Sequence, residues 1–349
     1  MSSLVIDAHY DLLFDVFRLR RQGERQVIER FYLEDLRTAG IDVLVCSLFV
    51  PDDYLPESAL RTALSQIGML HAELDESPGL FALCRNLDEV QKAHRSGQVA
   101  LLLSFEGADP IGFDLHLLKV FYELGVRFLG LVWSRRNFVA DGCHFTPKTE
   151  GTVGGLTAFG VELVVEAERL GMILDVSHLN DAGLANLLTF SKGPLIASHS
   201  NCRALCPVPR NLTDEQLTAL AQRGGVVGLN NMLSFVYPKD EGANTNAEGA
   251  NASGAASSSA PLLIPEGQPL YRGLLDHARH MIEVMGEDHV GLGLDLCEFQ
   301  KPEAERIKSA FPSYRHVLPF LEALDAELGP AVAEKIKGGN WLRILERLT

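Results

Sequence analysis

The sequence lacks the features that would place the protein in a membrane or in a disulfide-bonded, secreted class. Its six cysteines are scattered without a Cys-x-x-Cys pair, so we interpret them as reduced thiols. No apolar run approaches the ~20 residues that a membrane-spanning helix needs. The opening "MSSLVID" has neither a basic segment nor a long apolar segment, so no secretory signal is indicated. We therefore expect a cytoplasmic protein with no membrane association.

Basic residues are too few for a nucleic-acid partner. The chain has 31 Lys and Arg against 46 Asp and Glu, which gives a net charge of −15. This balance argues against nucleic acid or an anionic membrane as the main partner. It does not exclude a small anionic substrate, because one well-placed cation can outweigh the overall field. The 349 residues are enough for one large α/β barrel, so we expect a single domain over residues 1–349.

Eight short apolar runs recur along the chain and predict strands. They lie at 4–7, 41–50, 99–105, 126–133, 172–178, 195–200, 225–231 and 289–295. Most are almost continuously hydrophobic, as in parallel strands that are buried on both faces. Helical patterns lie between several of them, at 57–75, 115–124, 157–170, 181–190, 213–223 and 271–285.

This alternation predicts an α/β fold, a (β/α)8 TIM barrel, with C-terminal helices within 302–348. The alternative is an open, doubly wound sheet. We favour the barrel because eight strands are predicted and no Gly-x-Gly-x-x-Gly follows the first strand. Residues 240–261 are mostly Ala, Gly, Asn and Ser, so we expect a disordered insertion there. A tolerated surface insertion explains this segment more simply than a lid over the site.

Ionisable side chains stand at the ends of five predicted strands. They are His9 and Asp11 after the first strand, Glu106 after the third, His178 after the fifth, His199 after the sixth and Asp295 after the eighth. Each alone has an ordinary explanation. A His-x-Asp pair can belong to a helix cap or turn, and a lone histidine is more often a hydrogen-bonded core residue. Together they indicate one site, because the carboxyl ends of barrel strands converge on one mouth.

The residue types at this mouth favour metal ions. Imidazole and carboxylate suit zinc, cobalt or manganese. Three histidines and three carboxylates exceed the needs of one tetrahedral zinc, and they suit two ions ~3.5–4 Å apart.

Beyond these residues, the sequence resembles the membrane (renal) dipeptidase family of zinc metallopeptidases, within the amidohydrolase-like barrels. The resemblance covers nearly the whole chain. It is carried by "DAHYDLL", "SFEGA", "GGLTAFGVELVVEAERLGMILDVSHL", "ASHSNCRAL", "PRNLTDEQL", "GLGLD" and "GGNWLRIL". It implies a dipeptidase with two Zn²⁺ per chain that attacks the peptide bond through a metal-bridging hydroxide. It also implies small dipeptides as substrates, including L-Xaa-D-Xaa, and a homodimer.

The resemblance also implies a role for each metal-site residue. His9 and Asp11 would hold one zinc, His178 and His199 would hold the other, and Glu106 would bridge the two.

Three further residues receive roles in the same way. Arg210 would bind the terminal carboxylate of the substrate, and Asp295 would act as the catalytic proton shuttle. A guanidinium forks onto a carboxylate with two hydrogen bonds, which suits the first role. Trp133 stands where the animal enzymes carry a histidine that stabilises the oxyanion, so it would line the substrate site. This difference keeps open hydrolysis of another small amide, a cyclic amide or a lactone. A non-catalytic metal-binding barrel is the third alternative.

Overall fold

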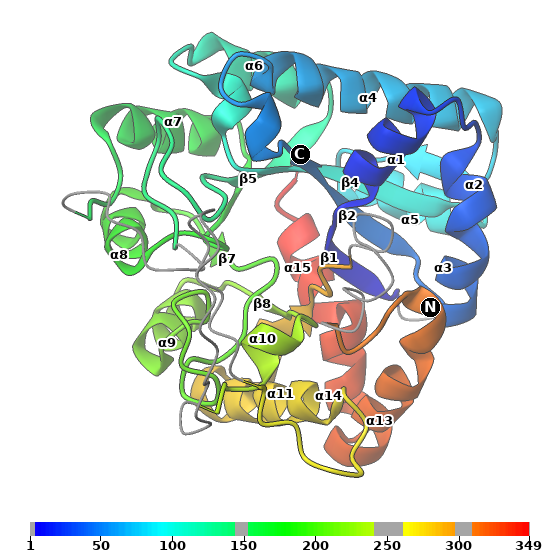
Figure 1. The fold of residues 1–349 in the computed structure, drawn as a ribbon, viewed down its shortest axis with the longest axis vertical. Coiled ribbons are helices and arrows are strands. Elements are labelled where there is room, and N and C mark those ends of the chain that lie inside the picture. Colours follow the sequence, from blue (N-terminus) through cyan, green and yellow to red (C-terminus); the bar gives the residue numbers. More distant parts are fainter. Residues whose placement is uncertain (1–3, 144–152, 241–260, 297–308, 349) are drawn as a thin grey trace, which may run out of the picture.

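The strands form a nearly closed ring with helices outside it (Figure 1). The computed structural model describes residues 4–143, 153–240, 261–296 and 309–348. In it, parallel strands follow one another in the order β7-β6-β5-β4-β2-β1-β9-β8. A parallel bridge between Ala197, just after β7, and Val227 of β8 joins the two ends of that row. The predicted barrel is therefore confirmed, and an open sheet is excluded.

Each of the eight predicted ranges overlaps one strand of the ring, and β1 and β4 run beyond the ends predicted for them. These are β1 (Ile6–Tyr10), β2 (Val43–Phe49), β4 (Val99–Glu106), β5 (Val126–Gly130), β6 (Ile173–Asp175), β7 (Leu195–Ile196), β8 (Val227–Leu229) and β9 (Val290–Leu292). The sequence did not predict β3 (Phe81–Leu83), which pairs with β4 outside the ring. Residues 80–84, which contain this strand, form a short apolar run that the sequence analysis passed over.

Helices fill the connections between strands. They are α1 (Leu12–Arg21), α2 (Val27–Phe31), α3 (Leu33–Ala39), α4 (Ala59–Glu76), α5 (Leu87–Arg95), α6 (His116–Glu123), α7 (Ala158–Arg169), α8 (Asp181–Phe190), α9 (Asp214–Gln222), α10 (Leu233–Val236), α11 (Arg272–Met285), α13 (Leu318–Leu328), α14 (Pro330–Glu334) and α15 (Asn340–Leu345). Before α9, Thr213 and Gln216 form a reciprocal capping box, which fixes where this helix begins.

The motif "GGNWLRIL" predicts that Asn340 caps the last helix, and this prediction is wrong. Residue 340 has helical dihedral angles, because a π-helical turn (Lys335–Gly339) leads into α15 without a break. The Asn340 side chain instead donates hydrogen bonds to the carbonyls of Glu287 and Val290. It therefore ties α15 to the segment that leads into β9 rather than capping a helix.

Two apolar cores hold the barrel together. The larger one lies between the strands and the surrounding helices. The smaller one joins alternate residues at the beginnings of the strands, such as Ile6, Val43 and Ala100, to the side chains of α15. Within it, the Trp341 indole donates a hydrogen bond to the carbonyl of Leu292 in β9. The helix α15 therefore closes the end of the barrel at which the strands begin, and Figure 1 shows it behind the centre of the ring.

Most of the insertion expected at 240–261 lies outside the described residues, which omit 241–260. Its two ends lie side by side. The Asp240 amide donates to the Pro261 carbonyl at 2.9 Å, and Lys239 and Leu262 form an antiparallel bridge. The described residues on either side of 241–260 are therefore joined by backbone hydrogen bonding. Among the described residues, no helix is both long enough and apolar enough to cross a bilayer.

Candidate active site

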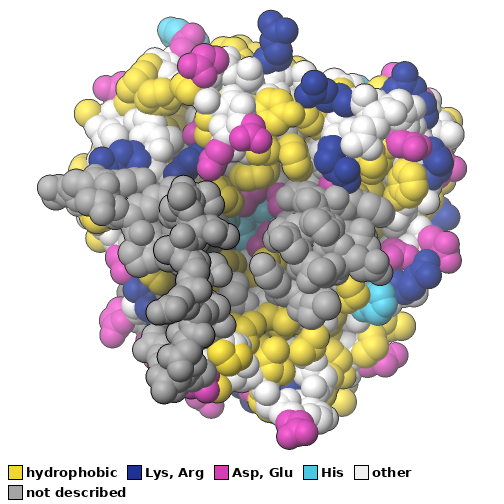
Figure 2. Space-filling view, viewed as in Figure 1, with side chains coloured by type: hydrophobic (Ala, Val, Ile, Leu, Met, Phe, Trp, Pro, Cys, Tyr) yellow, Lys and Arg dark blue, Asp and Glu magenta, His cyan; other side chains and the backbone are white. Residues whose placement is uncertain are grey.

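The predicted polar residues meet at the end of the barrel where the strands finish. His9 lies in β1, Asp11 follows it, and Glu106 ends β4. His178 and Asp295 stand three residues beyond β6 and β9, and His199 lies at the same distance beyond β7. In the space-filling view, acidic and histidine side chains are visible at the bottom of a central hollow on this face (Figure 2).

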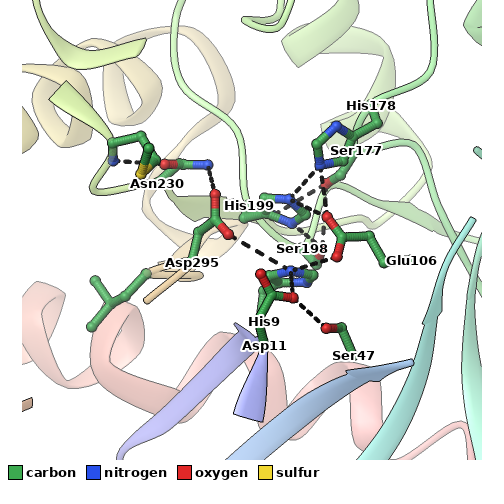
Figure 3. Close-up of polar contacts among 12 residues, drawn as sticks. His9, Asp11, Ser47, Glu106, Ser177, His178, Ser198, His199, Asn230 and Asp295 are labelled. Carbon is green, nitrogen blue, oxygen red and sulfur yellow. Dashed lines mark hydrogen bonds and ion pairs between the residues drawn. The ribbon is translucent and has the colours of Figure 1, made fainter. Parts of the chain in front are cut away.

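Glu106 lies between two groups of side chains (Figure 3). On one side, its Oε2 is 3.6 Å from Nε2 of His9, which is also 3.6 Å from Oδ1 of Asp11. On the other side, its Oε1 is 3.0 Å from Nε2 of His178 and 3.8 Å from Nε2 of His199. The two latter nitrogens are 2.9 Å apart. One carboxylate thus presents a separate oxygen to each of two histidine-containing groups.

Two of these residues have a backbone conformation that residues other than glycine seldom adopt. The φ angle is 68° at His178 and 55° at Asp295. Such left-handed conformations carry a small energetic cost and concentrate at functional sites. Here they turn the chain at the point where it leaves the barrel strand. Tertiary contacts therefore hold both side chains in the hollow.

The alternative explanation of Asp11 as a helix cap is wrong. Asp11 occupies the N-cap position of α1, but its side chain makes no capping hydrogen bond. Its Oδ1 instead accepts a hydrogen bond from Ser47 of β2 and lies near His9. The His-x-Asp pair at the end of β1 therefore belongs to the site.

The charges of this cluster suit divalent cations. Burial and the nearby Asp11 carboxylate raise the pKa of Glu106 to about 8, and burial also raises the pKa of Asp295. Burial alone would lower the pKa of His9, but the Glu106 and Asp11 carboxylates raise it well above its ordinary value. Buried carboxylates this close repel one another, and a cation relieves that repulsion.

The donor atoms fit such ions as well. Burial lowers the pKa of His178 and His199 well below the usual value, which favours the neutral imidazole that binds metals. Nε2 of His9 and Oε2 of Glu106 are buried and lack a hydrogen-bond partner among the described residues. Three overlapping groups have ligand atoms within 4.8 Å of one another: His9, Asp11 and Glu106; Glu106, His178 and His199; and His9, His199 and Asp295.

Serine and asparagine side chains that the sequence analysis did not single out hold these groups in place. Oγ of Ser134 lies 2.8 Å from Nδ1 of His178, and Asn230 donates to Oδ2 of Asp295 at 2.9 Å. Oγ of Ser198 lies 2.7 Å from Nδ1 of His199. In the sequence, only Ser198 stands beside a candidate ligand. The others come from distant segments, and no local pattern could have pointed to them.

The place of Arg210, just before the expected helix at 213–223, would also suit a surface arginine at a helix start, but its side chain is buried. Its side chain donates from Nη1 to Ser200 Oγ and from Nη2 to the His199 carbonyl, both at 2.6 Å. Its buried Nε has no hydrogen-bond partner in the described part of the chain. The Arg210 charge helps to lower the pKa of His178 and His199, so it acts on the same site.

Trp133 follows β5 and lies beside this cluster. Its ring centre is 6.0 Å from that of His178 and 5.3 Å from that of Phe49. The guanidinium carbon of Arg135 stands 5.2 Å from the Trp133 ring centre, which is a cation–π distance. An aromatic wall therefore flanks the histidine side of the site.

A family model now adds independent evidence. The model for membrane dipeptidases (peptidase family M19) matches residues 1–348. The chain belongs to this family. It is thus a metallopeptidase by family, and the expected resemblance is confirmed.

Several solved structures and curated proteins resemble the chain over most of its length. A dipeptidase of family M19 has a TM-score of 0.80 and 30% identity, over 100% of this chain and 99% of its own. A metallopeptidase from Rhodobacter sphaeroides, bound to a phosphinate mimic of L-Ala-D-Ala, has a TM-score of 0.79 and 30% identity, over 99% of both chains. An uncharacterised protein in the pqqA 5′ region of Klebsiella pneumoniae is 30% identical, over 84% of this chain and 98% of its own.

The match to dipeptidase verJ of Clonostachys rogersoniana is 29% identical and spans 76% of this chain but only 63% of the fungal protein. Family membership identifies the chain as a peptide-bond hydrolase of the dipeptidase type. The metal-site prediction agrees with a metallopeptidase.

Proposed function

We propose that the protein hydrolyses dipeptides with two divalent metal ions, zinc in the first place, at the end of the barrel. Glu106 carries this proposal, because it gives one oxygen to the His9 group and the other to the His178 and His199 group. A carboxylate shared in this way is the usual bridge between two ions. Asp11 would complete the first group.

Bound there, the ions would acidify a water molecule that serves as the nucleophile, and they would polarise the scissile carbonyl. The protein's own residues would do the rest. Asp295 would take a proton from the nucleophile and return it to the leaving amine. Its Oδ2 is held by Asn230, while its Oδ1 points toward His9 at 3.8 Å. Burial raises the pKa of Asp295, which favours a carboxyl that can both accept and donate a proton.

Arg210 would bind the terminal carboxylate of the dipeptide. Two of its N–H groups are used to fix the guanidinium on Ser200 and His199, which orients the remaining donors. A rigid cation of this kind selects a substrate that ends close to the scissile bond. Trp133 would contribute an apolar wall rather than a charged oxyanion donor.

L-Xaa-D-Xaa dipeptides would be among the substrates. The support is the Rhodobacter sphaeroides relative, whose structure holds a mimic of L-Ala-D-Ala. The cytoplasmic location and the homodimer stay predictions. All five cysteines in the described part of the chain are unpaired, as a reducing compartment would require.

Turnover by the purified, zinc-reconstituted protein tests the proposal. L-Ala-L-Ala, L-Ala-D-Ala and Gly-D-Ala would be offered in parallel, with cyclic amides and lactones in the same panel. We expect dipeptide hydrolysis that a chelator abolishes and that added zinc, cobalt or manganese restores. Two bound ions per chain with turnover only of a cyclic amide or lactone would show that Trp133 accompanies a different substrate class. Two bound ions with no turnover would support a non-catalytic barrel.

A further inference from the structure

A buried carboxylate stands behind His199 without entering the metal-site cluster itself. Asp175, the last residue of β6, accepts a hydrogen bond from the Ser198 hydroxyl on its Oδ2. Oγ of the same serine lies 2.7 Å from Nδ1 of His199. All three side chains are at most 5% exposed. Asp175, Ser198 and His199 therefore form a continuous hydrogen-bonded chain that ends at the imidazole (Figure 3 shows its last link).

The position of Asp175 is fixed by the backbone. Its Oδ1 accepts the amide N–H groups of Ser177 and Ser198, both at 2.9 Å. These two bonds connect the segment after β6 to the segment after β7. The Ser177 hydroxyl in turn accepts the backbone N–H of His199 at 3.2 Å. Asp175 cannot turn away without breaking bonds to both segments.

The direction of each proton follows from the chemistry of the groups. A carboxylate oxygen can only accept, so the Ser198 hydroxyl proton points to Asp175. Oγ of Ser198 then has only lone pairs left, and it accepts a hydrogen bond from Nδ1–H of His199. With the proton on Nδ1, the Nε2 lone pair is exposed toward Glu106 and His178. The opposite tautomer would place an N–H where a metal ligand is needed.

We propose that Asp175 and Ser198 are positioning residues that hold His199 in the Nδ1–H tautomer, so that its Nε2 is ready to bind a metal ion. This inference rests on the proposed function, in which His199 is a ligand. Partners that orient a ligating histidine in this way typically contribute 10–100-fold to metal affinity. The two residues would act as one unit, because Asp175 reaches the imidazole only through the Ser198 hydroxyl.

The substitution Asp175→Asn tests the first member of this hydrogen-bonded series. The amide keeps the shape and can still accept the two backbone N–H groups through its oxygen. It places a donor where Oδ2 was, so the Ser198 proton must point to Nδ1 of His199 or to Ser177. This change favours the wrong tautomer. We expect Asp175→Asn and Ser198→Ala each to weaken binding of the zinc ion that His199 would hold by ~10–100-fold.

The experiment measures zinc per chain across a series of chelator concentrations at one pH, together with the melting temperature of the metal-stripped protein. Ser191→Ala is the matched control. It removes another serine–carboxylate hydrogen bond, from Ser191 to Glu168 at 2.8 Å, which lies away from the site. We expect its zinc affinity to equal that of the unaltered protein. Histidine-selective ¹⁵N NMR of the metal-stripped protein would show the Nδ1–H tautomer of His199 only while Ser198 is present.

The double variant gives the sharpest outcome. Because Asp175 acts through Ser198, adding Asp175→Asn to Ser198→Ala should cost no further zinc affinity. If Asp175→Asn lowered zinc affinity equally with Ser198 present and with Ser198→Ala, the inference would be overturned, since Asp175 would then act only through the backbone. Folded variants with unchanged zinc affinity would overturn it too. If Asp175→Asn fails to fold, the affinity and NMR spectrum of Ser198→Ala alone decide.

A separate variant distinguishes this inference from the proposed function. If His199→Ala keeps the zinc affinity of the unaltered protein, the proposed metal site is wrong and the inference falls with it. If His199→Ala loses zinc while Ser198→Ala and Asp175→Asn keep it, only the inference is wrong.

Discussion

The substitution Asp295→Asn is the most direct test of the proposed proton transfer. Asn has nearly the same shape as Asp and tolerates the left-handed backbone at this position, where φ is 55°. The new amide oxygen can still accept the hydrogen bond from Asn230, which is now 2.9 Å long. The change therefore removes the proton-accepting group and little else.

The expected size of the effect follows from the surroundings of Asp295. The other two carboxylates of the cluster, Asp11 and Glu106, lie 3.6 Å from His9 and are assigned to metal binding. As metal ligands, neither would be free to take over the proton. General acid–base catalysis by a positioned side chain contributes ~10²–10⁴-fold, or about 3–5 kcal/mol of transition-state stabilisation. We expect kcat to fall by that factor, with KM changed by less than about threefold.

The assay is steady-state hydrolysis of L-Ala-D-Ala at pH 7–8, with zinc per chain measured on the same samples. Asp288→Asn is the matched control, because this carboxylate pairs with Lys335 at the surface, far from the reaction. Its kcat should stay unchanged. A kcat within about threefold of the unaltered enzyme, at full zinc content, would refute the role of Asp295. A parallel loss of zinc would instead make Asp295 a ligand, consistent with its place beside His9 and His199.

Three further predictions concern other parts of the molecule. Arg210→Met should raise KM for dipeptides by about 30-fold or more, because a charged hydrogen-bond pair worth about 2 kcal/mol is lost; a dipeptide amide, which lacks the carboxylate, should show no such change. Glu106→Gln should lower zinc affinity more than the ~10–100-fold expected for residues that only orient a ligand, since both metal groups lose a charged ligand. Two tightly held ions per chain in this variant would contradict the proposal that Glu106 is shared between them. Arg20 lowers the pKa of Glu76 from 4.5 to about 2 by hydrogen bonding, so this pair stabilises the fold above pH 4.5 and ceases to do so as the pH falls toward 2. In urea unfolding of metal-stripped protein, Glu76→Gln should lower the free energy of unfolding by about 1 kcal/mol at pH 6 and by almost nothing near pH 2. An equal decrease at both pH values would contradict this pairing.

The barrel could be predicted from the sequence because the signal for each strand lies in its own residues. Each strand of a parallel barrel is buried on both faces, so it appears as an unbroken apolar run whatever lies next to it. Polar residues directly after such runs then stand at one end of the barrel by geometry alone. This argument located His9, Glu106 and His178 without any knowledge of their distances. The sequence analysis did not include β3, although this strand lies in the apolar run 80–84 and pairs with β4 outside the ring.

The arrangement of the site depended on contacts between distant segments. Ser47 and Asp11 are 36 residues apart in sequence, and Asn230 and Asp295 are 65 apart, yet each pair is hydrogen-bonded. No periodicity reports such a pair, since it arises only when neighbouring strands are brought side by side. The same holds for the buried position of Arg210, whose local sequence reads as an exposed helix start.

The sequence by itself thus determined the strands, the barrel and the types of ligand at its mouth, because burial and residue chemistry are properties of each short segment. Only the tertiary structure decided how Glu106 divides its oxygens between two groups and that Asp11 faces His9 rather than capping α1. It also revealed that Asp175 stands behind His199. Those features are set by the closure of the ring, which fixes distances between residues that no local pattern connects.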